Sequence, residues 1–392
     1  MAAPIPLEEK QRVCESTRSV SIGLPAAQNL GEHRFPLTPE GAAQLVDRGF
    51  DVRMERGAAS RIHYSDEAYA ACGVKIVERP EALGADIVIY LPALSVADAA
   101  KIRRGGLLLT FRHLAADDAP ALKVLLERHV LVLDLLEVSD PAGHRPFADI
   151  LHEIDGRAAM AIASSLLADS IHGKGILLGG VAGVVPCEVV LIGSDMAAIA
   201  AGRSALGLGA SVRIFDDNVY RLREALIALG CGVQGSTLHP RVFGNALRSA
   251  DIVVATDTEP RCGVVNSDLA ATMKRGVICF DLTSDPGSAF PSMPVVDLDL
   301  ASPSDTDPTA PVRLCYINAG NAVPRTVAMA LSNTFATMLA EILVCEGVSN
   351  ALRLNDGLRR AAILFMGKCV HPDAAKLLGC RHTDINLFLQ FS

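Results

Sequence analysis

Short apolar runs alternate with amphipathic stretches along the first third of the chain. The runs SVSIGLP, DIVIYLP, GLLLTF and HVLVLDLL have the length of strands, and TPEGAAQLVDRG and SDEAYAACG have helical spacing. Thr38 is followed by Pro39 and Glu40, which gives a cap, a proline in the first turn and an early acid, and so predicts a helix over 38–48. This rhythm of strand and helix is typical of a parallel sheet.

The same rhythm returns after a long helical segment. FADILHEIDGRAAMAIASSLLADSI, which starts at residue 147, keeps helical spacing for about six turns and is long enough to link two domains. EVVLIG, SVRIF, DIVVAT and VICFDLT follow, and the last two are almost wholly apolar, as strands covered on both faces are. Residues 300–312 are rich in Pro, Ser and Asp and predict a surface loop, while NAVPRTVAMALSNTFATMLAEILVCEG predicts a long apolar helix that packs on the first domain or on a partner subunit.

These patterns predict an α/β fold with two doubly wound, Rossmann-like domains, a cleft between them and long linking helices. Residues 1–152 and 317–392 would form a discontinuous substrate domain, and residues 153–316 a dinucleotide-binding domain.

Composition narrows the class of ligand. The chain has 392 residues, of which 50% are hydrophobic and 20% charged, enough for two globular cores. A net charge of -8 without basic clusters, and only 4% aromatic residues, argue against nucleic acid as a partner. The ten cysteines show no metal-type spacing, so we expect reduced, buried thiols and no metal. No secretory signal precedes the first strand and no apolar run reaches the ~18 residues of a membrane span, so we expect a cytoplasmic protein that binds a small molecule and no membrane.

A degenerate glycine motif begins the second series of strands. In LIGSDMAAIAAG, Gly193 fits the first glycine of G-x-G-x-x-G, but Asp195 stands at the second and Ala198 at the third. A side chain at the second position obstructs the approach of a pyrophosphate, and at ~4 Å and an effective dielectric of about 20 a like charge there costs on the order of 4 kcal/mol. Asp216 ends the next strand, where a carboxylate accepts ribose hydroxyls and repels a 2′-phosphate, and Arg221 follows it as a further candidate for cofactor binding. From this motif alone, a dinucleotide site and a turn without nucleotide both remain open.

Longer segments resemble one family over nearly the whole chain. SIGLPAAQNLGEHRFPLTPEGAAQLVDRGFDV, TFRHLAA, HEIDGRAA, GILLGGVAGVVPCEVVLIG, LGASVRIFD, DLTSDPG and NAGNAVPRT occur in the order typical of the alanine dehydrogenase and nicotinamide nucleotide transhydrogenase α-subunit family. The resemblance implies NAD as cofactor and a homo-oligomer, at least a dimer.

The resemblance also implies roles for four residues. Arg34 would pair with the substrate carboxylate, a task suited to its bidentate fork. His113 would be the acid and base that exchanges protons with a substrate amine or carbinolamine. Asp285 would orient the reacting nitrogen or a water beside the nicotinamide, and Asn318 is the family's active-site asparagine.

Four departures fall on contact positions of the family. Tyr90 and Leu91 stand where family dehydrogenases carry a substrate-binding lysine and the residue after it, so Tyr90 becomes a candidate substrate contact. Ala26 and Ala27 replace the segment that carries an acidic residue after the first strand. His152 replaces a serine, and TDTEPRCG replaces an IPG loop.

Two functions follow from this mixture. The first is an NAD-dependent oxidoreductase that acts on an amino or imino acid other than alanine, larger or less anionic. The second is a binding protein, a possible pseudoenzyme that has lost NAD and holds an amino acid or peptide in the inter-domain cleft. Asp195, Tyr90 and the altered loop favour the second, whereas Arg34, His113, Asp216 and Asp285 favour the first.

Overall fold

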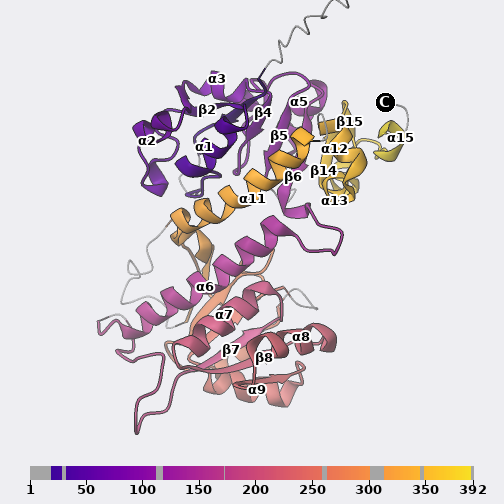
Figure 1. The fold of residues 1–392 in the computed structure, drawn as a ribbon. Helices are drawn as coiled ribbons and strands as arrows, with labels where there is room; N and C mark the ends of the chain where they lie inside the picture. The colour runs from indigo at the N-terminus through magenta and orange to yellow at the C-terminus, as the bar shows by residue number, and fades with distance from the viewer. Residues whose placement is uncertain are drawn as a thin grey trace, which may run out of the picture.

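The computed structural model describes residues 19–28, 32–111, 118–171, 173–257, 263–300, 313–344 and 348–389. Two sheets dominate these residues, one above and one below a pair of long helices in Figure 1. The prediction of an α/β fold with two Rossmann-like units is confirmed.

The first sheet has the strand order β15-β14-β6-β5-β4-β1-β2-β3. Strands β1 to β6 pair in parallel, and β14 joins β6 antiparallel. The strands are β1 (Ser21–Leu24), β2 (Asp51–Glu55), β3 (Lys75–Val77), β4 (Ile87–Ile89), β5 (Leu107–Thr110), β6 (Leu131–Asp134), β14 (Ala362–Phe365) and β15 (Lys368–Cys369). The β14 and β15 hairpin was not predicted, because AILF is too short to show a period.

The second sheet has the order β12-β13-β11-β10-β7-β8-β9 and is parallel throughout. The strands are β7 (Glu188–Ile192), β8 (Ser211–Phe215), β9 (Val233–Ser236), β10 (Ile252–Ala255), β11 (Ile278–Asp281), β12 (Val295–Asp297) and β13 (Leu314–Ile317). Every residue of β10 and β11 is buried, as their apolar composition predicted.

Helices cover both faces of each sheet. Alternate residues of β4 show this, because Ile87 and Ile89 join one apolar cluster and Val88 and Tyr90 join another. The helices are α1 (Pro39–Asp47), α2 (Asp66–Ala71), α3 (Arg79–Leu83), α4 (Val96–Ala99), α5 (Ala119–Glu127), α6 (Pro146–Ala168), α7 (Met196–Gly207), α8 (Val219–Leu229), α9 (Pro240–Ser249), α10 (Ser267–Thr272), α11 (Pro324–Val344), α12 (Val348–Leu354), α13 (Asp356–Arg360), α14 (Pro372–Leu378) and α15 (Asn386–Leu389). Short 3-10 turns are η1 (Ser60–Ile62), η3 (Leu135–Glu137) and η5 (Ala319–Ala322).

Helices α6 and α11 lie between the sheets (Figure 1). Gly156 of α6 packs directly on α7, because a Cβ there would overlap the Ala197 carbonyl oxygen. Ser332 of α11 donates to the Thr38 hydroxyl at the start of α1, across 3.4 Å, and accepts from the Thr38 backbone N–H at 2.6 Å. The predicted linking helices are therefore the elements that join the two sheets.

Thr38 caps α1, as predicted. The expected surface loop lies almost wholly outside the described residues. Of the cysteines that the structure describes, Cys187, Cys279, Cys315 and Cys369 are buried free thiols, whereas Cys231 and Cys380 are exposed. Within the same residues, no helix is both long and apolar enough to cross a membrane.

Candidate active site

Each sheet has a switch point where the strand order reverses, and ligands of such sheets bind beyond the carboxyl ends of the strands at that point. In the first sheet the switch lies between β1 and β4, and in the second it lies between β7 and β10. The chain after β1 leads to Arg34, and the chain after β7 begins with Gly193. The topology therefore places both candidate residues at the expected edges.

Arg34 forms a two-point ion pair with Glu32. Its Nε donates to Glu32 Oε1 at 2.8 Å and its Nη2 to Glu32 Oε2 at 2.7 Å. Arg61 holds the backbone carbonyl of Glu32 from η1. Glu32 thus fixes the fork of Arg34, and Nη1 is the terminal nitrogen that has no hydrogen-bond partner among the residues the structure describes. Nη1 therefore keeps both of its N–H donors for a ligand, and Glu32 uses only one N–H of Nη2.

The charges around Arg34 come from both halves of the molecule. Burial lowers the pKa of Arg34, but Glu32 and, more weakly, Asp155 of α6 and Asp299 after β12 outweigh it, so that the pKa is raised. Burial raises the pKa of Asp155, although Arg34 opposes that shift and the Gly320 amide donates to its Oδ1 at 2.8 Å. Arg34 is thus a fully charged cation among carboxylates from the opposite sheet.

Asn318 and Asn321 donate hydrogen bonds to two acidic residues at and just after the end of β12, Asp297 and Asp299. Asn318 has a left-handed backbone with φ 59°, and its Nδ2 donates to Asp297 Oδ1 at 2.8 Å and to Asp299 Oδ2 at 3.3 Å. Asn321 Nδ2 donates to the other oxygen of Asp299 at 2.5 Å. Burial nevertheless raises the pKa of Asp299 to about 6, with Asp297 adding to the shift. The charge beside Arg34 therefore changes close to neutral pH.

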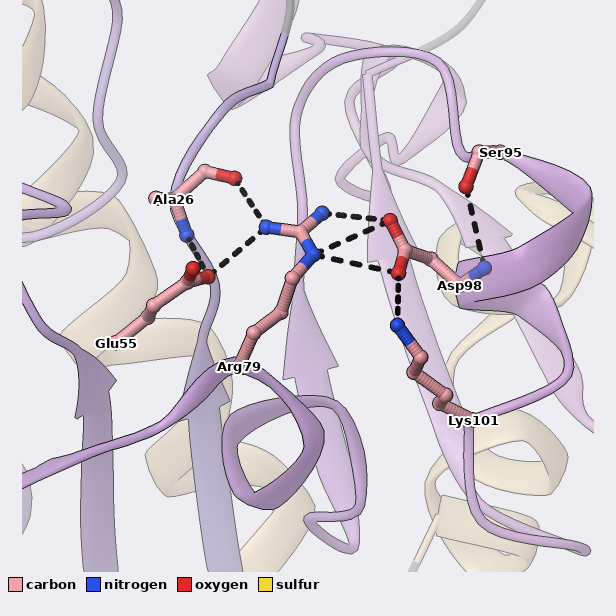
Figure 2. A network of polar contacts seen from close by, with 6 residues as sticks. All are labelled: Ala26, Glu55, Arg79, Ser95, Asp98 and Lys101. Atoms are coloured by element: carbon pink, nitrogen blue, oxygen red, sulfur yellow. Dashed lines mark hydrogen bonds and ion pairs between the residues drawn. The ribbon is translucent and has the colours of Figure 1, made fainter.

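Arg79 ties together the loops at the carboxyl edge of the first sheet (Figure 2). From the first turn of α3 its Nη1 donates to Glu55 Oε2 at 2.9 Å and to the Ala26 carbonyl at 2.8 Å, and its Nη2 donates to Asp98 at 2.7 Å. Glu55 also accepts from the Ala26 amide at 2.8 Å, so the backbone after β1 is held at both its polar groups. Lys101 completes the network through Asp98.

Tyr90 lies beside this network rather than in open space. Its ring is 4% exposed and packs with Leu108 and Leu122, while the Arg79 guanidinium carbon lies 5.8 Å from the ring centroid. At the position that the resemblance assigns to a lysine, the chain thus has the buried ring of Tyr90. The arginine beside that ring, Arg79, is paired with the carboxylates of Glu55 and Asp98. Direct contact between Tyr90 and a substrate stays a prediction.

The turn after β7 has the backbone that a dinucleotide site needs at its first glycine. Gly193 has φ 97°, and a Cβ there would overlap the Thr256 hydroxyl, so only glycine fits. Ser194 then donates to Asp216 Oδ2 at 2.5 Å. Asp216 is fully buried and also accepts from Arg221 Nη2 at 2.9 Å. The predicted ribose acceptor is therefore already paired with Ser194 and Arg221.

Asp195 is the N-cap of α7. Its Oδ1 accepts from the Ala198 amide at 3.0 Å, so the carboxylate lies on the helix N-terminus that would otherwise receive a phosphate. Burial raises the pKa of Asp195, while the Ala198 amide and the charge of His152 partly oppose the shift. The site fits a dinucleotide at Gly193 and Asp216, and Asp195 weakens that fit because an internal anion occupies one of the amides.

Asp285 is at the exposed tip of the loop that follows β11. Beside it, Ser284 donates from its backbone at 3.1 Å and from its hydroxyl at 2.5 Å to the two oxygens of Asp257, which follows β10. The loop is thus attached to the end of β10, the strand next to β7 and Gly193, so Asp285 lies at the carboxyl edge of the second sheet.

His113 lies outside the described residues, so its role stays a prediction. Within the described part of the chain, no three His, Cys, Asp or Glu side chains gather in an arrangement that could hold a metal ion. Sequence reasoning missed four residues of this site. Glu32 had a signal, because it is two positions from Arg34 in the same motif, whereas Asp155, Asp299 and Arg79 gain their partners only from distant segments.

Two family descriptions match this chain in the order of its sheets. Residues 23–148 match "Alanine dehydrogenase/PNT, N-terminal domain" and residues 159–372 match "Alanine dehydrogenase/PNT, C-terminal domain". The chain is 30% identical to an alanine dehydrogenase of Mycobacterium tuberculosis over 378 residues, which cover 93% of this chain and 98% of that one. It is 29% identical to an alanine dehydrogenase of Mycolicibacterium smegmatis, over 94% of this chain and 99% of that one.

Solved structures agree with this assignment. An L-alanine dehydrogenase superposes with a TM-score of 0.80 at 25% sequence identity and covers 92% of this chain and 99% of its own. A transhydrogenase from Sinorhizobium meliloti superposes with a TM-score of 0.71 at 17% identity, over 90% of this chain and 99% of that one, which is a likeness of fold alone.

Proposed function

This chain belongs to the alanine dehydrogenase/PNT family, and from that premise we propose that it is an NAD-dependent oxidoreductase acting on an amino or imino acid other than alanine. The observation that carries the proposal is that Asp155 of α6 and Asp299 after β12 act electrostatically on Arg34, which follows the first strand of the other sheet. A cation that binds carboxylates thereby lies next to the edge of a sheet with a dinucleotide-type turn.

Substrate binding would begin with Arg34. Because Glu32 holds Nε and one N–H of Nη2, a substrate carboxylate would approach the guanidinium from the side of Nη1, where charge-assisted hydrogen bonds remain available. Tyr90 in place of the family lysine supplies no second cation. A single cation that is already paired with Glu32 weakens the hold on a small substrate such as alanine and favours a larger substrate that gains apolar contact elsewhere.

Proton transfer would use His113, with Asp285 orienting the reacting nitrogen or a water. An imidazole titrates near neutral pH, which suits exchange with an amine or carbinolamine. Bound NAD would supply the hydride acceptor or donor. Its site would be formed by Gly193, Asp195, Ala198, Asp216 and Arg221. Ser194 or Arg221 would release its hydrogen bond to Asp216, so that this carboxylate can accept from the ribose hydroxyls.

A second candidate function follows from Asp195. A capping carboxylate on the α7 N-terminus and a paired Asp216 also suit a protein that has lost the cofactor and only binds an amino acid or peptide. The two functions separate cleanly in experiment, because only the first requires NAD.

The test begins with isothermal titration of the purified protein with NADH and NADPH. A panel of 2-oxo acids with ammonium is then offered with NADH, and a panel of amino acids with NAD, while NADH absorbance is followed. Turnover with a larger amino acid at a kcat/KM above that for alanine supports the proposal. NADH binding with alanine as the best substrate refutes the substrate class, and absence of NADH binding favours the second function.

Oligomerisation forms part of the same proposal. Residues 177–185 include apolar side chains that face solvent, with Val181, Val184 and Val185 exposed by 58%, 62% and 86%. Val181 and Val184 pair through their backbones, so these residues form a turn that presents its side chains outward. A second copy covering them would remove this apolar surface from water, which supports at least a dimer. Light scattering of the purified protein measures the mass.

A further inference from the structure

Asp281 is a buried carboxylate to which no role has so far been given. It ends β11 and is 1% exposed, directly after the fully buried Cys279 and Phe280. A carboxylate without hydrogen-bond partners in such a place costs several kcal/mol or becomes protonated. A buried Asp281 therefore needs hydrogen-bond donors around it, and the structure shows four hydrogen bonds to its carboxylate.

All four hydrogen bonds to Asp281 come from the loop that carries Asp285. Oδ1 accepts from the Thr283 amide at 3.0 Å and from the Thr283 hydroxyl at 2.6 Å. Oδ2 accepts from the Gly287 amide at 2.9 Å and from the Ala289 amide at 2.9 Å. One side chain thus binds the loop both before and after Asp285.

The backbone of Asp285 is attached to the same anchors. Its carbonyl oxygen accepts from the Ser288 amide at 3.0 Å and lies 3.0 Å from the Thr283 hydroxyl, the second acceptor within reach of that group. Together with the bonds from Ser284 to Asp257, these contacts hold the backbone of the turn and leave the side chain of Asp285 exposed.

We propose that Asp281 is the positioning residue of the reaction: it sets the height and direction of the turn that presents Asp285. The inference rests on the proposed function of Asp285 but concerns a different residue. Rates of reactions between bound groups depend steeply on geometry, and a displacement of ~1 Å costs about 100-fold. Asp281 would therefore act on kcat without touching substrate or cofactor.

Asp281→Asn is the variant that tests this. Its size is unchanged, but one oxygen becomes an NH₂ group, which places a donor against at least one N–H or O–H of the loop and releases it. Asp251→Asn is the matched control. Asp251 is also a buried carboxylate of the second sheet and accepts hydrogen bonds from Lys174 and Lys274. It directly precedes β10, so it lies at the edge of the sheet opposite to the one that carries Asp285.

The expected result is a split between the kinetic constants. Asp281→Asn should lower kcat by roughly 10- to 100-fold while KM and the NADH Kd stay within about 3-fold, because only the catalytic turn moves. The control should lose comparable thermal stability and keep kcat. Thr283→Val, which removes one hydroxyl bond, should give the same split more weakly, and it serves if Asp281→Asn fails to fold.

Amide hydrogen exchange supplies a reading that needs no activity. The amides of Gly287 and Ala289 should exchange faster in Asp281→Asn than in Asp251→Asn. Equal exchange in the two variants, or wild-type kcat in Asp281→Asn, overturns the inference. Wild-type kcat in Asp285→Asn instead overturns the proposed function of Asp285, and a protein that neither binds nor oxidises NADH overturns the enzyme itself. In those two cases the exchange rates still decide whether Asp281 holds the turn.

Discussion

Replacing Asp195 by Asn should strengthen NADH binding. Asp195 caps α7 through its bond to the Ala198 amide, so its carboxylate occupies part of the positive helix terminus that a pyrophosphate would use. Asn caps a helix about as well as Asp and has nearly the same size. The change therefore removes the charge and leaves the local fold in place.

The magnitude of the gain in NADH affinity depends on the distance between the Asp195 carboxylate and the pyrophosphate, which would share the N-terminus of α7. At ~5 Å and an effective dielectric of about 20, two like unit charges repel by about 3 kcal/mol, and at ~8 Å by about 2 kcal/mol. Burial raises the pKa of Asp195 and His152 offsets part of its charge, so the repulsion is only partly expressed. We expect a gain of about 1.4 to 2.8 kcal/mol, which is a 10- to 100-fold fall in the NADH Kd.

The pH dependence gives the prediction a sign. Protonation of Asp195 removes the charge beside the pyrophosphate, so wild-type NADH affinity should rise as pH falls through the raised pKa of Asp195. The Asn variant should lack this component. A proton bound more tightly in the folded state also means that wild-type stability falls as pH rises from the ordinary aspartate pKa to the raised one, and the variant should lose that slope.

Isothermal titration with NADH over a range of pH measures both effects. Asp195→Gly separates charge from shape: an extra gain over Asn would show that the side chain also blocks the backbone approach. Asp217→Asn is the control, since it removes an exposed carboxylate nearby and should change Kd by less than about 2-fold because solvent screens it. An unchanged Kd in both Asp195 variants would mean that the cofactor does not reach the α7 N-terminus, and the reasoning would be wrong.

Three further predictions address the rest of the site. NADH should bind more tightly than NADPH, and Asp216→Asn should narrow the ratio of the two Kd values, because it removes a repelled carboxylate and frees Arg221 for a 2′-phosphate; equal affinities in the wild type would place Asp216 away from the ribose. His113→Ala should lower kcat by roughly two to four orders of magnitude with an unchanged NADH Kd, and full activity would remove His113 from the mechanism. Because the pKa of Asp299 is about 6, its charge appears as pH rises through that value and opposes a substrate carboxylate at Arg34. KM should therefore increase above that pH in the wild type and stay flatter in Asp299→Asn, and parallel KM profiles would contradict this role.

The sequence by itself determined the class of fold, and its motifs supplied the candidate site residues. Strand-length apolar runs separated by helical segments specify parallel sheets, because each pattern can bury its apolar side chains in only one way. Thr38 before Pro39 predicted the start of α1, and the apolar composition of β10 and β11 predicted that both strands are buried on both faces. Motifs also predicted Arg34, Gly193, Asp216 and Asp285 as site residues, since a motif records the residues that are neighbours within one turn.

The tertiary structure decided which partners surround each of these residues. Asp195 could be read as an obstruction, but the start of α7 turns it into a cap. Asp216 was predicted as an acceptor for the ribose, and the structure shows that it already accepts from Ser194 and Arg221. Besides Glu32, the charge around Arg34 comes from Asp155 and Asp299, more than one hundred positions away, and the anchoring of Asp285 comes from a buried carboxylate at the end of an apolar strand. Electrostatic energy and hydrogen bonding depend on distance in space, so no local pattern could reveal partners that only the packing of two sheets brings together.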